Sequence, residues 1–390
     1  MRNNNLSILF LVNAYNSFQK DLIESIAPNC KQIYVFVRFR LGSNYLKYFS
    51  FLNLTHFEDS NLIKLENLPK NVQVFRVPVF FLPLTIIRKK IFNKFYKGIL
   101  KIIKIENIKF DLIHSVFTEP SGKAALLLSE KYKKPFVHTL YENDNWLTEI
   151  IENKQFDFQE FENKAAFFTS NSYRSKFNFK IPNFTIIYNG YNSNLYYQKS
   201  KEETKEYLKL DKSKKYLINI STVDERKNHE LLILAFCNLT LKYQNYNLLL
   251  IGDGPKMKYI KELINKLHLQ DRITLVGYQP HSKLNDWINA SEFFVLPSKA
   301  EGNPTVMFET LGTGTPFITT NVGGVSEIIN EDCGKVIHDF EVNSMTDAIE
   351  KAINKKWDKN KIVEYSKQFE ITVSAQKYTE IYEKVLNDCR

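Results

Sequence analysis

Two glutamates, Glu301 and Glu309, are separated by seven residues in the segment SKAEGNPTVMFE. Glu301 follows a short apolar run, and the Gly-Asn-Pro sequence after it predicts a tight turn before a helix that starts near Thr305. The free N–H groups and the dipole of a helix start favour an anion such as a phosphate or diphosphate. Glu309, about one turn into that helix, could accept hydrogen bonds from two vicinal hydroxyls, as in a ribose. An ordinary surface loop followed by an exposed helix glutamate is the alternative interpretation.

Two adjacent cations, Arg226 and Lys227, follow another predicted strand at a strand-to-helix turn. Positive charges there could neutralise a diphosphate that departs during a group transfer. A solvated surface charge pair is the alternative. No Asp-x-Asp pattern occurs in the chain, so we expect neither a metal-bridged diphosphate nor another cofactor.

Glycines mark the ends of two further predicted strands in this half of the chain. Gly252 lies in the sequence IGDGP, and Tyr278 follows the glycine of VGY. We expect both positions to line the same ligand site, although a glycine turn often serves backbone geometry alone.

Short apolar runs alternate with helix-period segments along the whole chain, a pattern typical of βαβ units and parallel sheets. Helices are expected between several of the runs and again at 372–386, near the end of the chain. Strands are predicted at 7–12, 32–38, 72–78, 112–115, 136–140, 166–170 and 185–188, and in the second half at 216–221, 246–251, 273–276, 293–297, 316–320 and 334–337.

Composition limits the class of protein. The 390 residues are 44% hydrophobic and 25% charged, as in a folded globular protein of two or three domains. No window approaches the ~20 apolar residues of a membrane-spanning helix. The four cysteines are far apart and show no metal-binding spacing, which argues against a disulfide framework and a zinc site and favours a cytoplasmic protein.

The net charge of +10 lies entirely in residues 1–195, so this half is expected to meet something anionic. The segment from Arg88 to Lys104 carries seven cations and no acid, with apolar residues interleaved at helical spacing. It predicts a basic amphipathic helix that could dock on an anionic membrane surface. An ordinary domain helix with a solvated cationic face is the alternative. No nucleic-acid-binding motif accompanies the charge, so nucleic acid is not expected as a partner.

Taken in order, these motifs resemble the retaining glycosyltransferases of family 4, also called glycosyl transferases group 1. The resemblance is specific from about 216 to 337 and weaker over the first half. It implies an α/β, GT-B fold, in which two doubly wound Rossmann-like domains face each other across a cleft. The implied acceptor domain is 1–195 together with a C-terminal helix, 371–390, that crosses back to it. The implied donor domain is 196–370.

The resemblance also implies roles for individual residues. Lys227 and Arg226 would offset charge on the donor diphosphate, Glu309 would hold the ribose, and Glu301 would contact the transferred sugar. The segment of Asn303, Pro304 and Thr305 would lie near the phosphates.

The sequence also departs from the family pattern. Thr222 stands where the family has an arginine, and Tyr141 stands where it has a histidine. Tyr141 and Asp144 are the acceptor-side candidates. His114 and His138 are interpreted as satisfied core histidines without a catalytic role.

The resemblance thus implies a metal-independent, retaining glycosyltransferase. Its donor would be a nucleotide sugar, with a UDP-sugar favoured, and its acceptor a saccharide or lipid-linked saccharide of a cell-surface polysaccharide or glycolipid. The enzyme would be cytoplasmic and peripheral at the inner face of the membrane. Two alternatives remain: another nucleotide-sugar enzyme such as an epimerase, and a non-catalytic protein that binds sugar nucleotides or membranes.

Overall fold

The computed structural model describes residues 5–41, 63, 65–80, 88–141, 164–170 and 183–388. The chain divides into two compact units, Met1–Tyr188 with Ile371–Arg390, and Asn189–Glu370. The division lies a few residues before the expected boundary at 195, because the connecting segment bonds to the second unit. The side-chain amide of Asn189 donates to the carbonyl of Asn303 at 2.7 Å, and the hydroxyl of Tyr191 lies 2.9 Å from that of Ser366.

The first unit contains a parallel sheet of seven strands in the order β3-β2-β1-β4-β5-β6-β7. Its strands are rich in apolar and β-branched residues because helices cover both faces of the sheet. The strands are β1 Ser7–Val12, β2 Gln32–Leu41, β3 Val72–Phe80, β4 Leu112–Val116, β5 Phe136–Leu140, β6 Phe167–Ser170 and β7 Phe184–Ile186.

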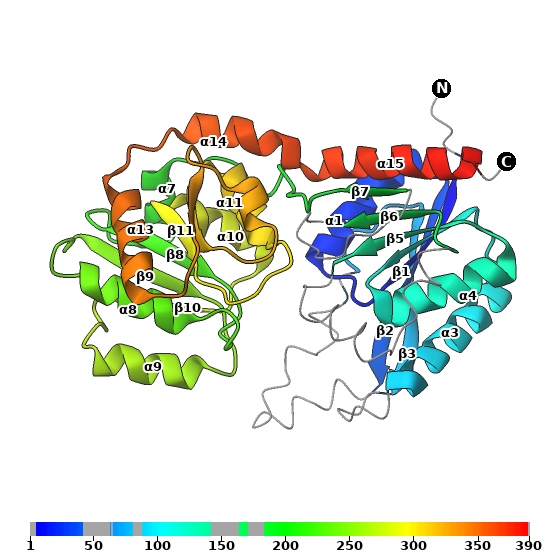
Figure 1. Ribbon diagram of the computed structural model, residues 1–390, viewed down its shortest axis with the longest axis horizontal. Coiled ribbons are helices and arrows are strands. Elements are labelled where there is room, and N and C mark those ends of the chain that lie inside the picture. Colours follow the sequence, from blue (N-terminus) through cyan, green and yellow to red (C-terminus); the bar gives the residue numbers. More distant parts are fainter. Residues whose placement is uncertain are drawn as a thin grey trace. The chain divides into compact units, whose positions relative to one another are not determined.

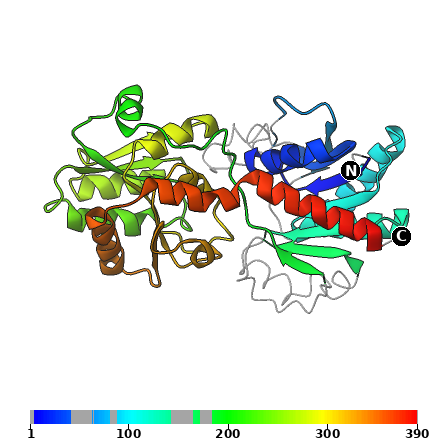
Figure 2. The same ribbon diagram turned by 90° about the horizontal axis from the view of Figure 1, so that it is seen from above.

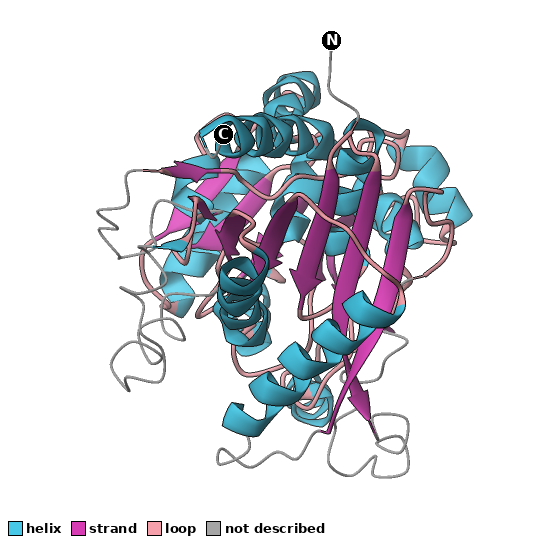
Figure 3. Cartoon of the chain, turned by 90° about the vertical axis from the view of Figure 1, so that its right-hand side faces the viewer, coloured by secondary structure: helices cyan, strands magenta, loops and turns pink. Residues whose placement is uncertain are grey.

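Helices pack on both faces of this sheet (Figure 3). The buried side chains of α1 (Ser17–Ile26) and α15 (Ile371–Asp388) share one core with the strands. Those of α3 (Arg88–Ile105) and α4 (Lys123–Tyr132) share a second core. The short helices of this unit are η1 Ala27–Asn29 and η5 Thr118–Gly122.

The last helix belongs to the first unit and is drawn in red in Figure 2. Its buried Tyr382 hydroxyl lies 2.5 Å from Nδ1 of His114, and its Tyr378 hydroxyl lies 3.1 Å from Oγ1 of Thr139. Burial lowers the pKa of His114 to about 3. His138 is also buried, with Nδ1 2.8 Å from the hydroxyl of Ser115, and burial lowers its pKa to about 3. Both histidines are therefore neutral core residues, as the sequence indicated.

The second unit contains a parallel sheet of six strands in the order β10-β9-β8-β11-β12-β13 (Figure 1). Helices α8 and α13 pack together, and their apolar side chains share a core with strands β8 to β13. The strands are β8 Lys215–Ile220, β9 Tyr246–Ile251, β10 Ile273–Gly277, β11 Phe293–Leu296, β12 Phe317–Thr320 and β13 Gly334–Ile337. The helices are α7 Lys201–Tyr207, α8 His229–Leu239, α9 Met257–Lys266, η6 His281–Lys283, α10 Leu284–Asn289, α11 Thr305–Gly312, α12 Val325–Ile328, α13 Val342–Asn354, α14 Lys359–Ser366 and η7 Lys367–Phe369.

The basic segment forms α3, but the apolar face of this helix packs against the sheet of the first unit. Phe95, Ile99 and Ile103 are buried in the core of the first unit, whereas Lys97 and Lys101 are exposed. A membrane could therefore contact α3 through charge, and not by insertion of its apolar face as an amphipathic helix would require. Among the described residues, no helix is long and apolar enough to cross a membrane.

Candidate functional site

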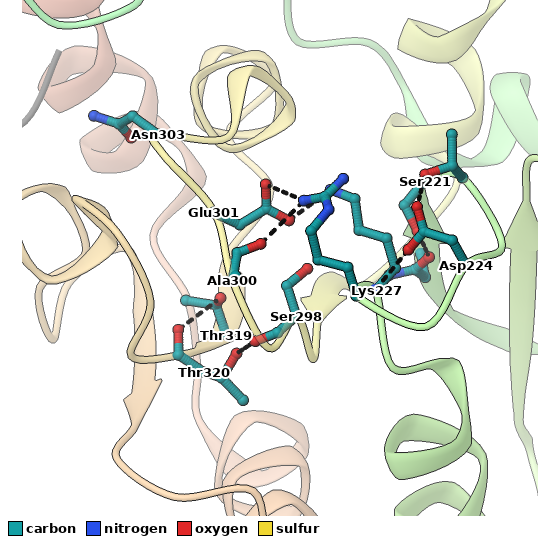
Figure 4. A network of polar contacts seen from close by, with 12 residues as sticks. Ser221, Asp224, Lys227, Ser298, Ala300, Glu301, Asn303, Thr319 and Thr320 are labelled. Carbon is teal, nitrogen blue, oxygen red and sulfur yellow. Dashed lines mark hydrogen bonds and ion pairs between the residues drawn. The ribbon is translucent and has the colours of Figure 1, made fainter. Parts of the chain in front are cut away.

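A buried ion pair joins two loops at the carboxyl edge of the second sheet. Strands β8 and β11 are neighbours, and the loops after them carry Lys227 and Glu301. The carboxylate of Glu301 accepts from Nζ of Lys227 at 2.6 Å through one oxygen and pairs with Nη1 of Arg226 at 2.9 Å through the other (Figure 4). The side chains of Glu301 and Lys227 are 8% and 11% exposed, and that of Arg226 is 40% exposed. The carboxylate of Glu301 thus forms ion pairs with both of the cations that the sequence singled out.

Hydrogen bonds within the loops hold these side chains in place. A carboxylate oxygen of Asp224 accepts from the backbone N–H of Lys227 at 2.9 Å, and the hydroxyl of Thr222 donates to the other oxygen at 2.9 Å. The guanidinium of Arg226 also donates to the carbonyl of Ala300 at 3.0 Å. Thr222, which stands where the resemblance expects an arginine, therefore supports the turn through Asp224.

Burial lowers the pKa of Lys227 below its ordinary value of 10.5, and the charge of Arg226 lowers it further. The carboxylate of Glu301 acts in the opposite direction. Glu301 therefore stabilises a cationic lysine in a place where burial disfavours the charge.

The turn after Glu301 is fixed by a second loop. The backbone N–H of Gly324 donates to the carbonyl of Gly302 at 2.9 Å. Gly323 has a φ of +55°, and a Cβ there would lie 2.0 Å from the same carbonyl, so only glycine fits. Pro304 is the extended residue before α11, which begins at Thr305, and Asn303 is buried with its carbonyl bonded to Asn189. The structure therefore holds the predicted turn and helix start rigidly beside the ion pair.

Glu309 lies on α11 and is buried. Its carboxylate accepts a hydrogen bond from Nε2 of His281 at 3.0 Å. Nothing in the spacing of His281 to Glu309 shows that η6 brings the two side chains together, so His281 could not be identified from the sequence alone.

Gly252 and Tyr278, the two positions expected from the glycine turns, differ in what the structure requires of them. Gly252 has a φ of +133°, and a Cβ there would lie 1.9 Å from the carbonyl oxygen of Ser221, so the backbone itself requires this glycine. Tyr278 is 66% exposed on the loop after β10. Both lie at the edge that carries Lys227 and Glu301, because all strands of this sheet are parallel.

Of the two residues expected on the acceptor side, Tyr141 lies among the residues that the structure describes. Tyr141 follows β5, and its ring meets those of Phe18 and Phe117 edge to face at 5.4 and 5.9 Å. Burial raises the pKa of its hydroxyl well above the ordinary value, so Tyr141 stays a neutral phenol. Asp144 lies outside the described residues.

Sequence comparison extends these observations. Residues 200–369, which include every site residue of the second unit, match the family described as "Glycosyl transferases group 1". The N-acetyl-alpha-D-glucosaminyl L-malate synthase of Bacillus anthracis is 29% identical over 43% of this chain, and the lipopolysaccharide core biosynthesis mannosyltransferase LpsB of Rhizobium meliloti is 28% identical over 53%. These matches span 42% and 62% of the two relatives' own lengths.

Structural comparison covers the whole chain. The crystal structure of HepE from Anabaena in complex with UDP superposes with a TM-score of 0.70 at 18% identity, covering 97% of this chain and all of the other. The chain therefore has the GT-B fold that the family resemblance implied. The segment 200–369, which carries the ion pair and the start of α11, is thus the part of the chain that is similar to the glycosyl transferases group 1 family.

Proposed function

We propose that this chain is a glycosyltransferase that uses a nucleotide sugar, with a UDP-sugar favoured, and a saccharide or lipid-linked saccharide acceptor. The observation that carries the proposal is the Lys227–Glu301–Arg226 cluster beside the start of α11. Two further facts support it: HepE is a fold neighbour crystallised with UDP, and LpsB is by its name a lipopolysaccharide mannosyltransferase.

The cluster suits a departing diphosphate. A lysine ammonium has three N–H donors, so Lys227 can hold Glu301 and still donate to phosphate oxygens. Arg226 is partly exposed and brings a second permanent charge. Preorganised cations stabilise the negative charge that develops as the bond between the sugar and the phosphate breaks.

The transfer passes through an oxocarbenium-like state, as glycoside hydrolysis does. The acceptor oxygen forms a bond to the anomeric carbon as the bond to the phosphate oxygen breaks, and the departing phosphate takes the hydroxyl proton. Attack on the face that the phosphate leaves would retain the anomeric configuration. Glu301 would receive hydrogen bonds from the transferred sugar, and the first unit, with Tyr141, would bind the acceptor.

The test is acceptor-dependent release of UDP from UDP-glucose or a related UDP-sugar, with lipid-linked saccharides from cell envelopes as acceptors. The proposal predicts release that requires both substrates, together with a glycosylated acceptor. An epimerase would convert the sugar without releasing UDP, and a binding protein would leave the donor intact. Either result would contradict the proposal.

We expect transfer to be independent of divalent metal ions, because Lys227 and Arg226 supply the charge that a metal would otherwise bring. Activity measured before and after dialysis against EDTA should be the same. Activity that disappears with EDTA and returns with Mg²⁺ or Mn²⁺ would show that the diphosphate needs a bound metal.

We also propose that the enzyme attaches peripherally to the cytoplasmic face of an anionic membrane through the cationic side of α3. Each lysine near an anionic surface contributes about 1 kcal/mol, which salt screens within a Debye length of about 8 Å. Changing Lys97, Lys101 and Lys104 together to Gln should lower binding to phosphatidylserine vesicles at low salt by roughly a hundredfold.

A matched control removes three exposed lysines of α9, Lys258, Lys261 and Lys266, in the second unit. This variant has the same net charge and should bind the vesicles as the wild type does. Equal loss in both variants would mean that net charge alone acts. No binding by the wild type at low salt would leave α3 as a solvated scaffold helix.

A further inference from the structure

We propose that His281 is a positioning residue for nucleotide recognition, which it serves by fixing the carboxylate of Glu309. The inference rests on the proposed function and adds to it a residue outside the sequence motifs. Nε2 of His281 donates to Oε1 of Glu309 at 3.0 Å, because a carboxylate can only accept. Among the described residues, Oε2 of Glu309 has no hydrogen bond or ion pair, so it remains available to a ligand.

Contacts with Tyr196 fix the position of His281. The ring of Tyr196 meets the ring of His281 edge to face at 5.3 Å, and its hydroxyl donates to the His281 carbonyl at 3.4 Å. Tyr196 is 1% exposed. His281 also opens the η6 turn, which the bond from the Lys283 N–H to the Pro280 carbonyl closes at 2.9 Å. The imidazole therefore approaches Glu309 in one fixed orientation.

The energetic consequence is preorganisation. A glutamate side chain has several rotatable bonds, and fixing them when a ligand binds costs conformational entropy. His281 fixes them beforehand, so Glu309 can meet a ribose diol with less loss on binding. Because the ribose does not react, the effect should be equal in the ground and transition states and should change KM much more than kcat.

The experiment compares two ligands on the full-length chain by calorimetry. The first is whichever of UDP, GDP and ADP gives the largest thermal shift, and the second is its 2′,3′-dideoxy analogue. The ratio of their dissociation constants measures recognition of the ribose hydroxyls alone. We expect this ratio to be well above one in the wild type and close to one in Glu309→Ala.

His281→Ala should lower the ratio by about fivefold, a size typical of the net loss of one hydrogen bond. His281→Gln should restore most of it, because the Gln amide can donate in place of Nε2. His268→Asn, at an exposed position with a φ of +53°, is the matched control and should keep the wild-type ratio. Asparagine tolerates that backbone conformation.

Distinct results separate the inference from the proposed function. If His281→Ala keeps the ratio, or if both ligands weaken equally in this variant, His281 does not position Glu309. If His281→Gln behaves as His281→Ala does, the hydrogen bond is not the cause. If none of the three nucleotides binds the wild type, the proposed function itself fails.

Discussion

Replacement of Lys227 by alanine should reduce glycosyl transfer by a factor of ~10²–10³, the usual effect of removing one preorganised electrostatic partner of a developing charge. The reason is the position of its Nζ atom, buried and 2.6 Å from Glu301 at the edge where the diphosphate would depart. Steady-state release of UDP gives the measurement. Arg226, which pairs with the same carboxylate, should keep the loop folded in the variant.

Lys299→Ala is the control for this experiment. Lys299 is also paired with a glutamate, Glu225, at 2.6 Å, but its side chain is 46% exposed. It should keep near-normal turnover. Near-normal turnover in Lys227→Ala would instead remove Lys227 from the mechanism.

Glu301→Gln should lose most transfer, by a similar factor of ~10²–10³, and should also destabilise the second unit. The variant leaves the buried Lys227 without its anion, and breaking a buried pair in this way costs about 3–5 kcal/mol. Chemical denaturation of the full chain measures the loss. Glu225→Gln is the matched control, because Glu225 also pairs with two lysines but is 67% exposed, and exposed pairs contribute about 0–1 kcal/mol.

The pH dependence of that loss has a definite sign. Without Glu301 the pKa of Lys227 falls further below 10.5, because burial and the charge of Arg226 lower it and only the weaker attraction of Asp224 opposes them. Between this depressed pKa and 10.5 the unfolded chain binds more protons than the folded chain, so stability rises with pH. The destabilisation of Glu301→Gln relative to the wild type should therefore shrink from pH 7 toward pH 10. A constant difference would show that the charge on Lys227 is not its cause.

Much of the fold followed from the sequence because parallel strands buried on both faces are continuous apolar runs. The strands Ser7–Val12 and Tyr246–Ile251 have the bounds that were predicted for them. The packing of the C-terminal helix on the first unit has no local signal in the sequence, and the expectation of it came from the family resemblance alone.

The site could be predicted less completely, because its contacts depend on strand order. Lys227 and Glu301 were expected at adjacent strand ends of one sheet but were given separate roles, because nothing local in the sequence shows that their side chains form an ion pair. His281 was missed for the same reason. In α3 the sequence showed two faces correctly, but only the packed sheet reveals that the apolar face is already buried.

The most direct test of the account is calorimetric titration of UDP into the wild-type chain and into Lys227→Ala. UDP is the departing group with its charge fully developed, so its affinity reports the contact that the mechanism requires. We predict that the wild type binds UDP, that Lys227→Ala binds it at least about tenfold more weakly, a difference of about 1.4 kcal/mol, and that uridine, which lacks phosphates, does not distinguish the two proteins. Equal affinity of UDP for both proteins, or no binding of UDP, GDP or ADP to the wild type, would contradict the assignment of a nucleotide-sugar site to this cluster.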